Sequence, residues 1–222
     1  MCYAMCMNPR VVGAMLLVMV AACFTTGAIV YPILPSHFVS HWNAGGQANG
    51  TISAFAGAFL LPLIMLAAVI FWAILPFIDP IAPGFKGFRY VYDFIIFLMI
   101  AFMAYIYALT LGANLGWRLA MPTLILLPLA AFMFILGALL PYIKRNWFVG
   151  IRTPWTISND IAWNKTHRFG RVLFEISAAF ILIAAFVPKT LTLWFIFVPL
   201  IGATLAIFIY SYFVYIANLR AQ

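Results

Sequence analysis

The chain has 222 residues, of which 67% are hydrophobic and only 7% are charged. A soluble domain of this length needs far more charge on its surface, so the composition excludes a soluble globular protein and predicts an integral membrane protein. A net charge of +8 would favour nucleic-acid binding in a soluble protein. Here the basic residues lie between apolar runs, where they indicate topology and contacts with anionic lipids, so we expect no direct nucleic-acid partner.

Six apolar runs have about the length needed to cross roughly 30 Å of hydrocarbon as helices. They cover residues 11–31, 53–75, 92–111, 119–140, 171–188 and 191–217. The fold class that they predict is an all-α membrane protein with six transmembrane helices. We expect a single transmembrane domain over residues 1–222, with an N-terminal half at 1–112 and a C-terminal half at 113–222.

The distribution of basic residues predicts the orientation, because short loops rich in Lys and Arg resist translocation. With the N-terminus inside, ten of the twelve Lys and Arg residues lie on the cytoplasmic side and only Arg118 and Lys189 lie outside. Both termini are therefore expected to be cytoplasmic. The loop at residues 32–51 then faces outside, and the basic stretch at residues 142–171 faces the cytoplasm.

The external loop, residues 32–51, contains two histidines four positions apart, His37 and His41. On a helix this spacing would place both imidazoles on one face, where they could hold zinc. A third ligand is missing on that side, so the alternative is that the histidines and Trp42 lie at the membrane interface and bond to loop backbone. Asn43, Gly45 and Gly46 fit a tight turn whose exposed backbone N–H groups could receive a peptide or carboxylate.

Residues 142–171, hereafter the platform, hold six of the twelve Lys and Arg residues. Gly150, through its wider range of backbone conformations, and Pro154, through its fixed φ, set the backbone geometry. Arg152 presents a planar set of donors, and Trp155 provides an amphipathic ring for the headgroup level. These residues predict a rigid basic and aromatic surface. It either anchors the loop to lipid phosphates and helix ends or docks a cytoplasmic partner or inserted ligand.

A short interfacial amphipathic helix is expected inside the platform, over about residues 159–170, before the fifth span. Ser158 can cap it, and Asp160 in its first turn suits the helix dipole. The helical period places apolar residues such as Ile161 on one side and polar residues opposite. Its polar end is expected to carry Lys165, Thr166, His167 and Arg168.

Catalytic and metal-binding groups are scarce in the sequence. Glu175, near the start of the fifth span, is expected to pair with Arg171 one turn earlier rather than to act as an acid or base. The three cysteines, Cys2, Cys6 and Cys23, have no metal-ligand spacing and are expected to be free thiols. We therefore expect no cofactor.

Two stretches resemble known families. The segment NWFVGIRTPWTISNDIAWNKTHRFG, residues 146–170, resembles the signature segment of the SdpI-like membrane proteins, which are immunity proteins against a secreted peptide toxin of the Sdp type. The external loop resembles the LP…HWN…G pattern of a domain of unknown function that often forms the N-terminal half of those proteins. The resemblance implies a six-helix prokaryotic membrane protein that protects its cell from a toxin and, in the best-known setting, holds a cytoplasmic repressor at the membrane.

The first functional hypothesis is therefore an immunity or signalling protein whose partners are membrane lipids, a peptide toxin and a cytoplasmic repressor. A toxin would contact the external loop or the helix bundle, and the platform would present the cytoplasmic surface. The candidate binding residues are His41, Trp42, Asn43 and Gly46 outside, and Asn146, Arg152, Thr153, Pro154, Trp155, Lys165, Thr166, His167 and Arg168 inside. Two alternatives stay open: a membrane-embedded metal-dependent hydrolase using His37 and His41, and a small transporter with proline-containing helices.

Overall fold

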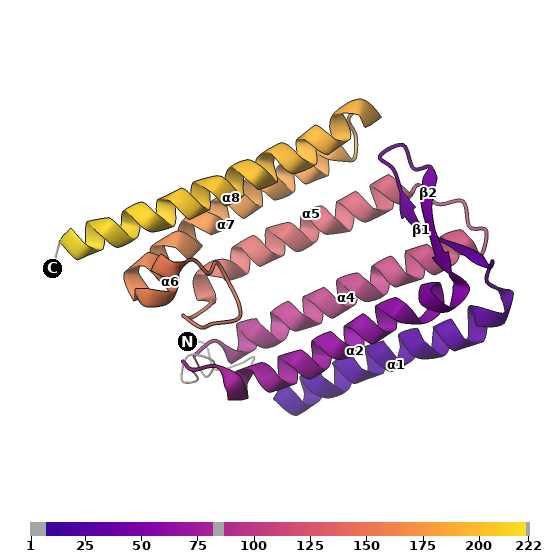
Figure 1. The fold of residues 1–222 in the computed structure, drawn as a ribbon, viewed down its shortest axis with the longest axis horizontal. Coiled ribbons are helices and arrows are strands. Elements are labelled where there is room, and N and C mark those ends of the chain that lie inside the picture. Colours follow the sequence, from indigo (N-terminus) through magenta and orange to yellow (C-terminus); the bar gives the residue numbers. More distant parts are fainter. Residues whose placement is uncertain (1–7, 82–86, 221–222) are drawn as a thin grey trace. The chain divides into compact units, whose positions relative to one another are not determined.

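The structure, a computed structural model, describes residues 8–81 and 87–220 (Figure 1). It is helical apart from one β-hairpin. The elements in chain order are α1 (Pro9–Val30), the 3-10 helix η1 (Tyr31–Ile33), β1 (His37–Trp42), β2 (Ala48–Ser53), α2 (Ala54–Ile78), α4 (Arg89–Asn114), α5 (Met121–Leu139), the 3-10 helix η2 (Leu140–Tyr142), α6 (Pro154–Ser158), α7 (Asp160–Ala184) and α8 (Lys189–Arg220).

Five helices are long and apolar enough to cross a membrane. They cover Pro9–Ile33, Ala54–Ile78, Arg89–Asn114, Met121–Tyr142 and Lys189–Arg220. These correspond to the first four predicted spans and the last one. The fifth predicted span falls in α7, whose first half is polar and belongs to the platform, so the helix as a whole is less apolar than the others.

The chain divides into two compact units, each described by itself. The first contains Met1–Ile74 and Asp93–Pro128, and the second contains Leu75–Tyr92 and Leu129–Gln222. Within the first unit, the hydroxyl of Tyr107 on α4 donates to the carbonyl of Ala58 on α2, at 2.7 Å. Gly27 lets α1 approach the same point closely, since a Cβ there would lie 2.7 Å from that carbonyl oxygen.

The external loop is more ordered than the sequence indicates, because residues 37–53 form an antiparallel β-hairpin. The loop expected at 32–51 is therefore ordered, and the hairpin within it was not predicted. In β1, Phe38 is buried and the neighbouring His37 is exposed, but the rest of the strand does not alternate between buried and exposed residues. The pairing is irregular on both sides of His41, where the register shifts.

A side chain from α4 fastens this hairpin to the first unit. The amide of Asn114 accepts a hydrogen bond from the backbone N–H of Val39 at 2.7 Å and donates to the carbonyl of the same residue at 2.9 Å. It thereby occupies the outer edge of β1 at Val39 in the way a neighbouring strand would. The hairpin is thus held at both its edge and its Phe38 side chain.

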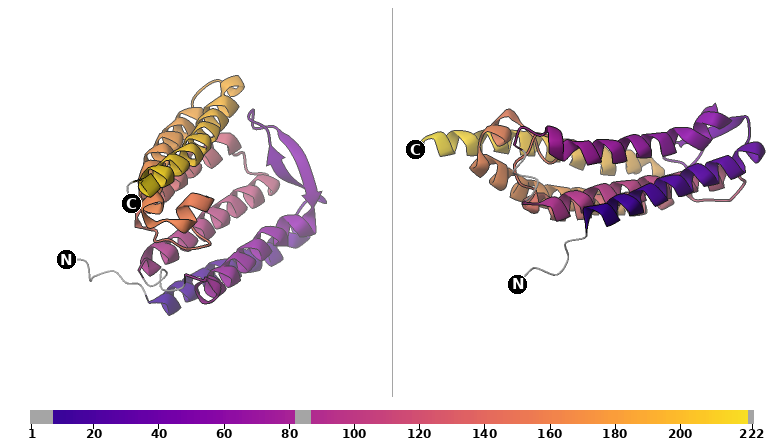
Figure 2. Two further views of the ribbon diagram at one scale, coloured as in Figure 1. Left: turned by 60° about the vertical axis from the view of Figure 1, so that its left-hand side comes forward. Right: turned by 90° about the horizontal axis from the view of Figure 1, so that it is seen from below.

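The second unit is organised around α7 and α8, which lie side by side in Figures 1 and 2. They are joined by residues 185–188 and run antiparallel. The sequence predicted a separate interfacial helix that ends at about residue 170. That end is wrong, because α7 continues without a break from Asp160 to Ala184. Neither glycine nor proline within 171–184 interrupts it, which explains why nothing ends the helix at Arg171.

Candidate functional site

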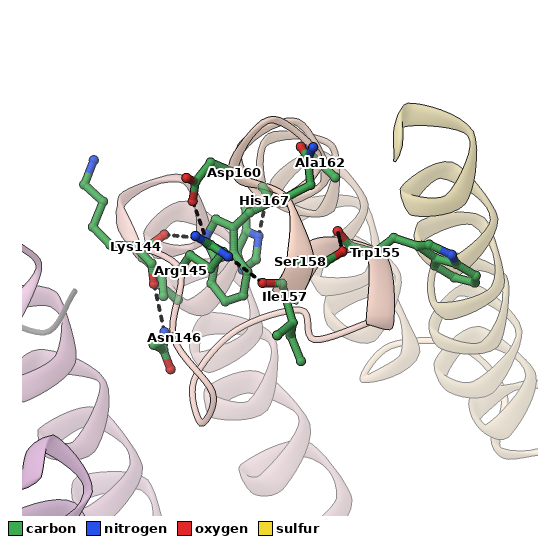
Figure 3. Close-up of polar contacts among 12 residues, drawn as sticks. Lys144, Arg145, Asn146, Trp155, Ile157, Ser158, Asp160, Ala162 and His167 are labelled. Carbon is green, nitrogen blue, oxygen red and sulfur yellow. Dashed lines mark hydrogen bonds and ion pairs between the residues drawn. The ribbon is translucent and has the colours of Figure 1, made fainter. Parts of the chain in front are cut away.

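The platform, residues 142–171, is the part of the second unit with the densest polar contacts (Figure 3). It consists of a loop after η2, the short helix α6 and the first turns of α7. Most of its charged side chains are exposed, whereas those of Asn146, Thr153, Thr156 and His167 are buried. The platform is thus a small folded body at the end of two long helices.

Asn146 closes the first loop of the platform. Its side chain is fully buried, at 0% exposure. The amide nitrogen donates to the carbonyls of Lys144 and Val149, at 2.8 and 2.9 Å, and the amide oxygen accepts from the N–H groups of Phe148 and Val149, at 2.8 and 2.7 Å. All its polar capacity is used inside the platform, because an amide has two donor hydrogens and an oxygen with two lone pairs.

His167 holds the second turn of the loop against α7. Its Nε2 accepts a hydrogen bond from the backbone N–H of Ile151 at 3.0 Å, and its Nδ1 lies 2.8 Å from the carbonyl of Trp163. A nitrogen that accepts from an N–H carries no proton, so the ring is neutral and protonated at Nδ1. Burial lowers the pKa of His167 to about 4, against a smaller opposite effect of the bond to Trp163.

Gly150 makes this contact possible. Its φ of +112° is one that side chains other than hydrogen rarely allow, and a Cβ at this position would lie 2.5 Å from Nε2 of His167. The sequence singled out Gly150 for its backbone freedom, and the structure adds the reason: the backbone passes directly over the imidazole edge. The ring in turn stacks on buried Trp163, with centroids 4.2 Å apart.

Thr153 and Trp155 join the platform to α8. Thr153 caps α6 in a reciprocal capping box with Thr156, and its hydroxyl donates to that of Ser211 on α8 at 3.1 Å. Trp155 packs edge-on against Phe208 and Tyr212, with centroids 5.0 and 5.2 Å apart. The GIRTPWT turn is therefore a junction with the last helix.

Two ion pairs, Arg145–Asp160 and Arg171–Glu175, and one buried carboxylate, that of Asp79, complete the polar contacts of the platform. Arg145 reaches Asp160 at 2.6 Å and the carbonyl of Ile157 at 2.7 Å, and Figure 3 shows its side chain lying between the two. Asp79, buried at 4% exposure just after α2, accepts from the backbone N–H of Trp147 at 2.9 Å. The expected pair between Arg171 and Glu175 is confirmed, with a separation of 2.7 Å.

Four basic side chains remain exposed on the platform: Lys144, Arg152, Lys165 and Arg168. Arg152 donates to the carbonyl of Trp147 at 2.9 Å. Within the described residues, Lys144, Lys165 and Arg168 have no acidic partner within ion-pair distance. Their charge is therefore presented to the surroundings.

The predicted faces of the platform helix need correction. Thr166 and His167, expected at its polar end, are buried at 0% and 1% exposure, whereas Ile161 is 45% exposed. The buried side of α7 is the one that meets the platform loop, which the helical period alone does not reveal. The cap was also misplaced by one residue, because Asn159 rather than Ser158 accepts from the N–H of Ala162.

The external candidates lie in the hairpin of the first unit. His41 is exposed, and its Nδ1 lies 2.6 Å from the side-chain oxygen of Asn49. The helical spacing assumed for His37 and His41 is wrong, since both lie on β1, and no group of three His, Cys, Asp or Glu side chains suited to a metal occurs among the described residues.

The turn of the hairpin satisfies its own backbone. The side-chain oxygen of Asn43 accepts from the N–H groups of Gly45 and Gln47, at 2.9 and 3.0 Å, and the N–H of Gly46 donates to the carbonyl of Asn43. The expectation that these N–H groups are open to a ligand is therefore wrong. Gly46 has the φ of +77° that the turn requires, and Trp42 ends β1 opposite Ala48.

Several residues that build the platform were missed from the sequence. Trp163 is 1% exposed and donates from its indole nitrogen to the carbonyl of Ile143 at 2.8 Å. Asp79 and Ser211 lie 68 and 58 residues from their platform partners. The sequence could have predicted the contact between Trp163 and His167, because they lie one helical turn apart. Nothing in the sequence points to Asp79 or Ser211, which are distant from their partners along the chain.

Comparisons with known proteins agree with this arrangement. The model of the SdpI/YfhL protein family matches residues 142–212, and that of a domain of unknown function (DUF1648) matches residues 18–66. The resemblance to the SdpI-like proteins is confirmed. The chain is also 24% identical over 170 residues to the "Immunity protein SdpI" of Bacillus subtilis (strain 168), covering 77% of this chain and 79% of that protein. No solved structure matches.

The SdpI/YfhL match covers the platform, α7 and most of α8, which is the part that the second unit holds together through Thr153 and Trp155. The match to the domain of unknown function covers part of α1, the hairpin and the start of α2. Together with five apolar helices, the similarity places the chain among multi-pass proteins of the cell membrane.

Replacing Gly150 by Ala is expected to destabilise the platform through backbone strain and through the clash with His167. Gly116→Ala is the matched control, because Gly116 also has a positive φ, +92°, but a Cβ there meets nothing within 4 Å. Gly116→Ala should therefore cost about 1–3 kcal/mol of strain alone, and Gly150→Ala should lower the melting temperature in detergent by more. Equal shifts in the two variants would contradict the close approach to the imidazole.

The neutral imidazole of His167 predicts a pH dependence of stability. Because its pKa falls from 6.5 to about 4 on folding, the unfolded chain binds an extra proton between these values. Stability is therefore full above pH 6.5 and falls as the pH drops toward 4, by an amount on the order of 3 kcal/mol.

Thermal melting between pH 4 and pH 8 measures this loss. His167→Gln should be less stable at pH 7 but should show a flatter profile, whereas His41→Gln, at an exposed position, should keep the wild-type profile. A His167→Gln variant that retains the full acid-side decline would show that another group is responsible.

Proposed function

We propose that the chain is a membrane immunity protein that gives its cell resistance to a secreted peptide toxin. The observation that carries the proposal is the coincidence of the SdpI/YfhL match, residues 142–212, with a segment that folds as one unit from the platform to α8. The similarity to an immunity protein over 77% of the chain supports the same conclusion. No chemistry beyond binding is needed for such a role.

The metal-dependent hydrolase is the less supported alternative. In the described part of the chain, His37 and His41 have no third ligand nearby, and Nδ1 of His41 is engaged with Asn49. His167 also fits poorly as a general base, because both its ring nitrogens bond to the backbone and its side chain is 1% exposed. The support for a transporter is the presence of prolines within α2 and α5, Pro62 and Pro128.

We further propose six membrane spans with both termini in the cytoplasm. The additional span covers residues 171–188, which are the second half of α7, antiparallel to α8, and the four residues that join the two helices. Since α8 has 32 residues and is long and apolar enough to cross a membrane, we infer that a helix packed along its first half enters the same layer. This places the platform, Arg10 and Arg220 on one side, as the positive-inside rule requires.

In this orientation the exposed cations of the platform form its cytoplasmic face. Lys165 and Arg168 lie one turn apart on α7, with Arg152 and Lys144 on the loop. This face suits anionic lipid headgroups and an acidic surface of a cytoplasmic repressor. The buried candidates, Asn146, Thr153, Thr166 and His167, would support it from inside, and Trp155 would fix it to α8.

Cysteine labelling tests the six-span topology. In a background in which Cys2, Cys6 and Cys23 are replaced by Ser, Ser40→Cys on the hairpin should react with a membrane-impermeant maleimide added to intact cells. Lys165→Cys, also at an exposed position, should react only after the membrane is opened. Labelling of both positions in intact cells would contradict the proposed orientation.

Survival tests the immunity proposal. Cells sensitive to an Sdp-type toxin and expressing the chain should survive concentrations that kill cells with an empty vector. Gly150→Ala should reduce survival in proportion to the loss of folded protein, whereas Gly116→Ala should protect nearly as well as the wild type. If the wild-type protein reaches the membrane at normal levels and survival equals that of the vector control, the chain is not an immunity protein for that toxin.

A further inference from the structure

A groove lies between α7 and α8, and on α7 it runs from Leu173, two residues beyond the platform, to Phe180. Its cavity measures about 410 Å³, within the range of roughly 300–1,000 Å³ found for ligand sites. Small residues form part of its lining, and aromatic rings with a proline form another part. The small residues are Ser177, Gly202 and Ala203, and the aromatic residues and proline are Phe180, Trp194 and Pro199. We call this the α7–α8 groove.

Two features make the groove more than a lipid-facing surface. The hydroxyl of Ser177 is buried, with the residue 1% exposed, and has no hydrogen-bond partner among the described residues. Pro199 has no N–H to offer the carbonyl of Phe195 one turn earlier, and both residues line the groove. In hydrocarbon no water is available to satisfy such groups, so a partner that bonds to them gains more than it would at a wet surface.

The shape of the groove suits a helix. A Cβ added to Gly202 would meet nothing within 4 Å, so the backbone of α8 is uncovered at this point. Small residues at such a position let a second helix approach closely, and Ser or Thr side chains then bond across the contact. An alkyl chain would fill the volume but could not bond to Ser177. The chemistry therefore favours an apolar peptide helix with small or hydroxyl-bearing residues on one side.

We propose that the α7–α8 groove binds an apolar helical segment of the peptide toxin within the membrane. The inference rests on the proposed immunity function, which it extends by naming a place and a mode of capture. The groove residues on α8, from Trp194 to Ala203, lie in the half that begins at Lys189. With both termini inside, the Trp194 end of the groove lies toward the exterior, from which a secreted toxin arrives, and its Leu173 end lies toward the platform.

Photocrosslinking in vesicles tests the groove directly. The full-length protein is reconstituted in phosphatidylethanolamine and phosphatidylglycerol with a synthetic Sdp-type toxin peptide. A photoreactive residue replaces Val198, which lines the groove and is 56% exposed, or Phe197, which does not line it and is 54% exposed. The peptide should crosslink at position 198 and much less at 197. Adducts at position 198 with lipid only, or with a second copy of the chain only, would overturn the proposal.

Substitutions in the groove test its contribution to affinity. Gly202→Phe fills the groove and should abolish binding of the labelled peptide, whereas Thr204→Phe, on another face of α8, should leave binding unchanged. Ser177→Ala removes one hydroxyl and should weaken binding about three- to tenfold. Ser177→Ala also keeps the test decisive if Gly202→Phe does not reach the membrane. Unchanged binding in folded Gly202→Phe and Ser177→Ala would overturn the proposal.

Survival assays on the same variants separate this inference from the proposed function. If the wild type protects and Gly202→Phe protects equally, the groove inference is wrong although immunity stands. If the wild type fails to protect but the peptide still crosslinks at position 198, the groove is a binding site and the immunity function is wrong.

Discussion

The contact between the backbone N–H of Ile151 and Nε2 of His167 is the constraint on which the platform depends. It requires a neutral ring, a tautomer with the proton on Nδ1, and a residue without a side chain at position 150. Each requirement is met by a local feature: burial excludes the imidazolium, the Trp163 carbonyl holds the Nδ1 proton, and Gly150 allows the approach. Without this contact the loop from Asn146 to Arg152 would lose its attachment to α7.

This arrangement separates two roles within a strongly basic segment. The charges that set membrane topology lie on the outside, at Lys144, Arg152, Lys165 and Arg168. Neutral groups, chiefly Asn146, Thr153, Thr156 and His167, form the interior. Burying neutral hydrogen-bonded groups costs far less than burying charge. A basic loop at a membrane face can therefore be rigid, and its surface charge can change without unfolding it. Such a surface can meet lipid or a protein partner while the fold beneath stays constant.

Composition predicted the membrane class, the length of the apolar runs predicted the five apolar helices, and helical spacing predicted the Arg171–Glu175 pair. These features could be predicted because each depends on residues near one another in sequence. The β-hairpin could not, since its strands are short and Asn114, which fastens it, is 75 residues from Val39. The buried face of α7 was likewise misassigned. Amphipathic periodicity assumes an apolar interior, and here a polar loop covers the helix and buries Thr166 and His167.

The tautomer and charge of His167 test the account most directly. The full-length protein, labelled with 15N at histidine and placed in lipid nanodiscs, should show one of its three imidazoles as a neutral ring protonated at Nδ1 at pH 7. That signal should disappear in His167→Gln and should keep its form at pH 5.5. An Nε2-protonated ring, or an imidazolium at pH 5.5, would contradict a platform built on the Ile151–His167 contact.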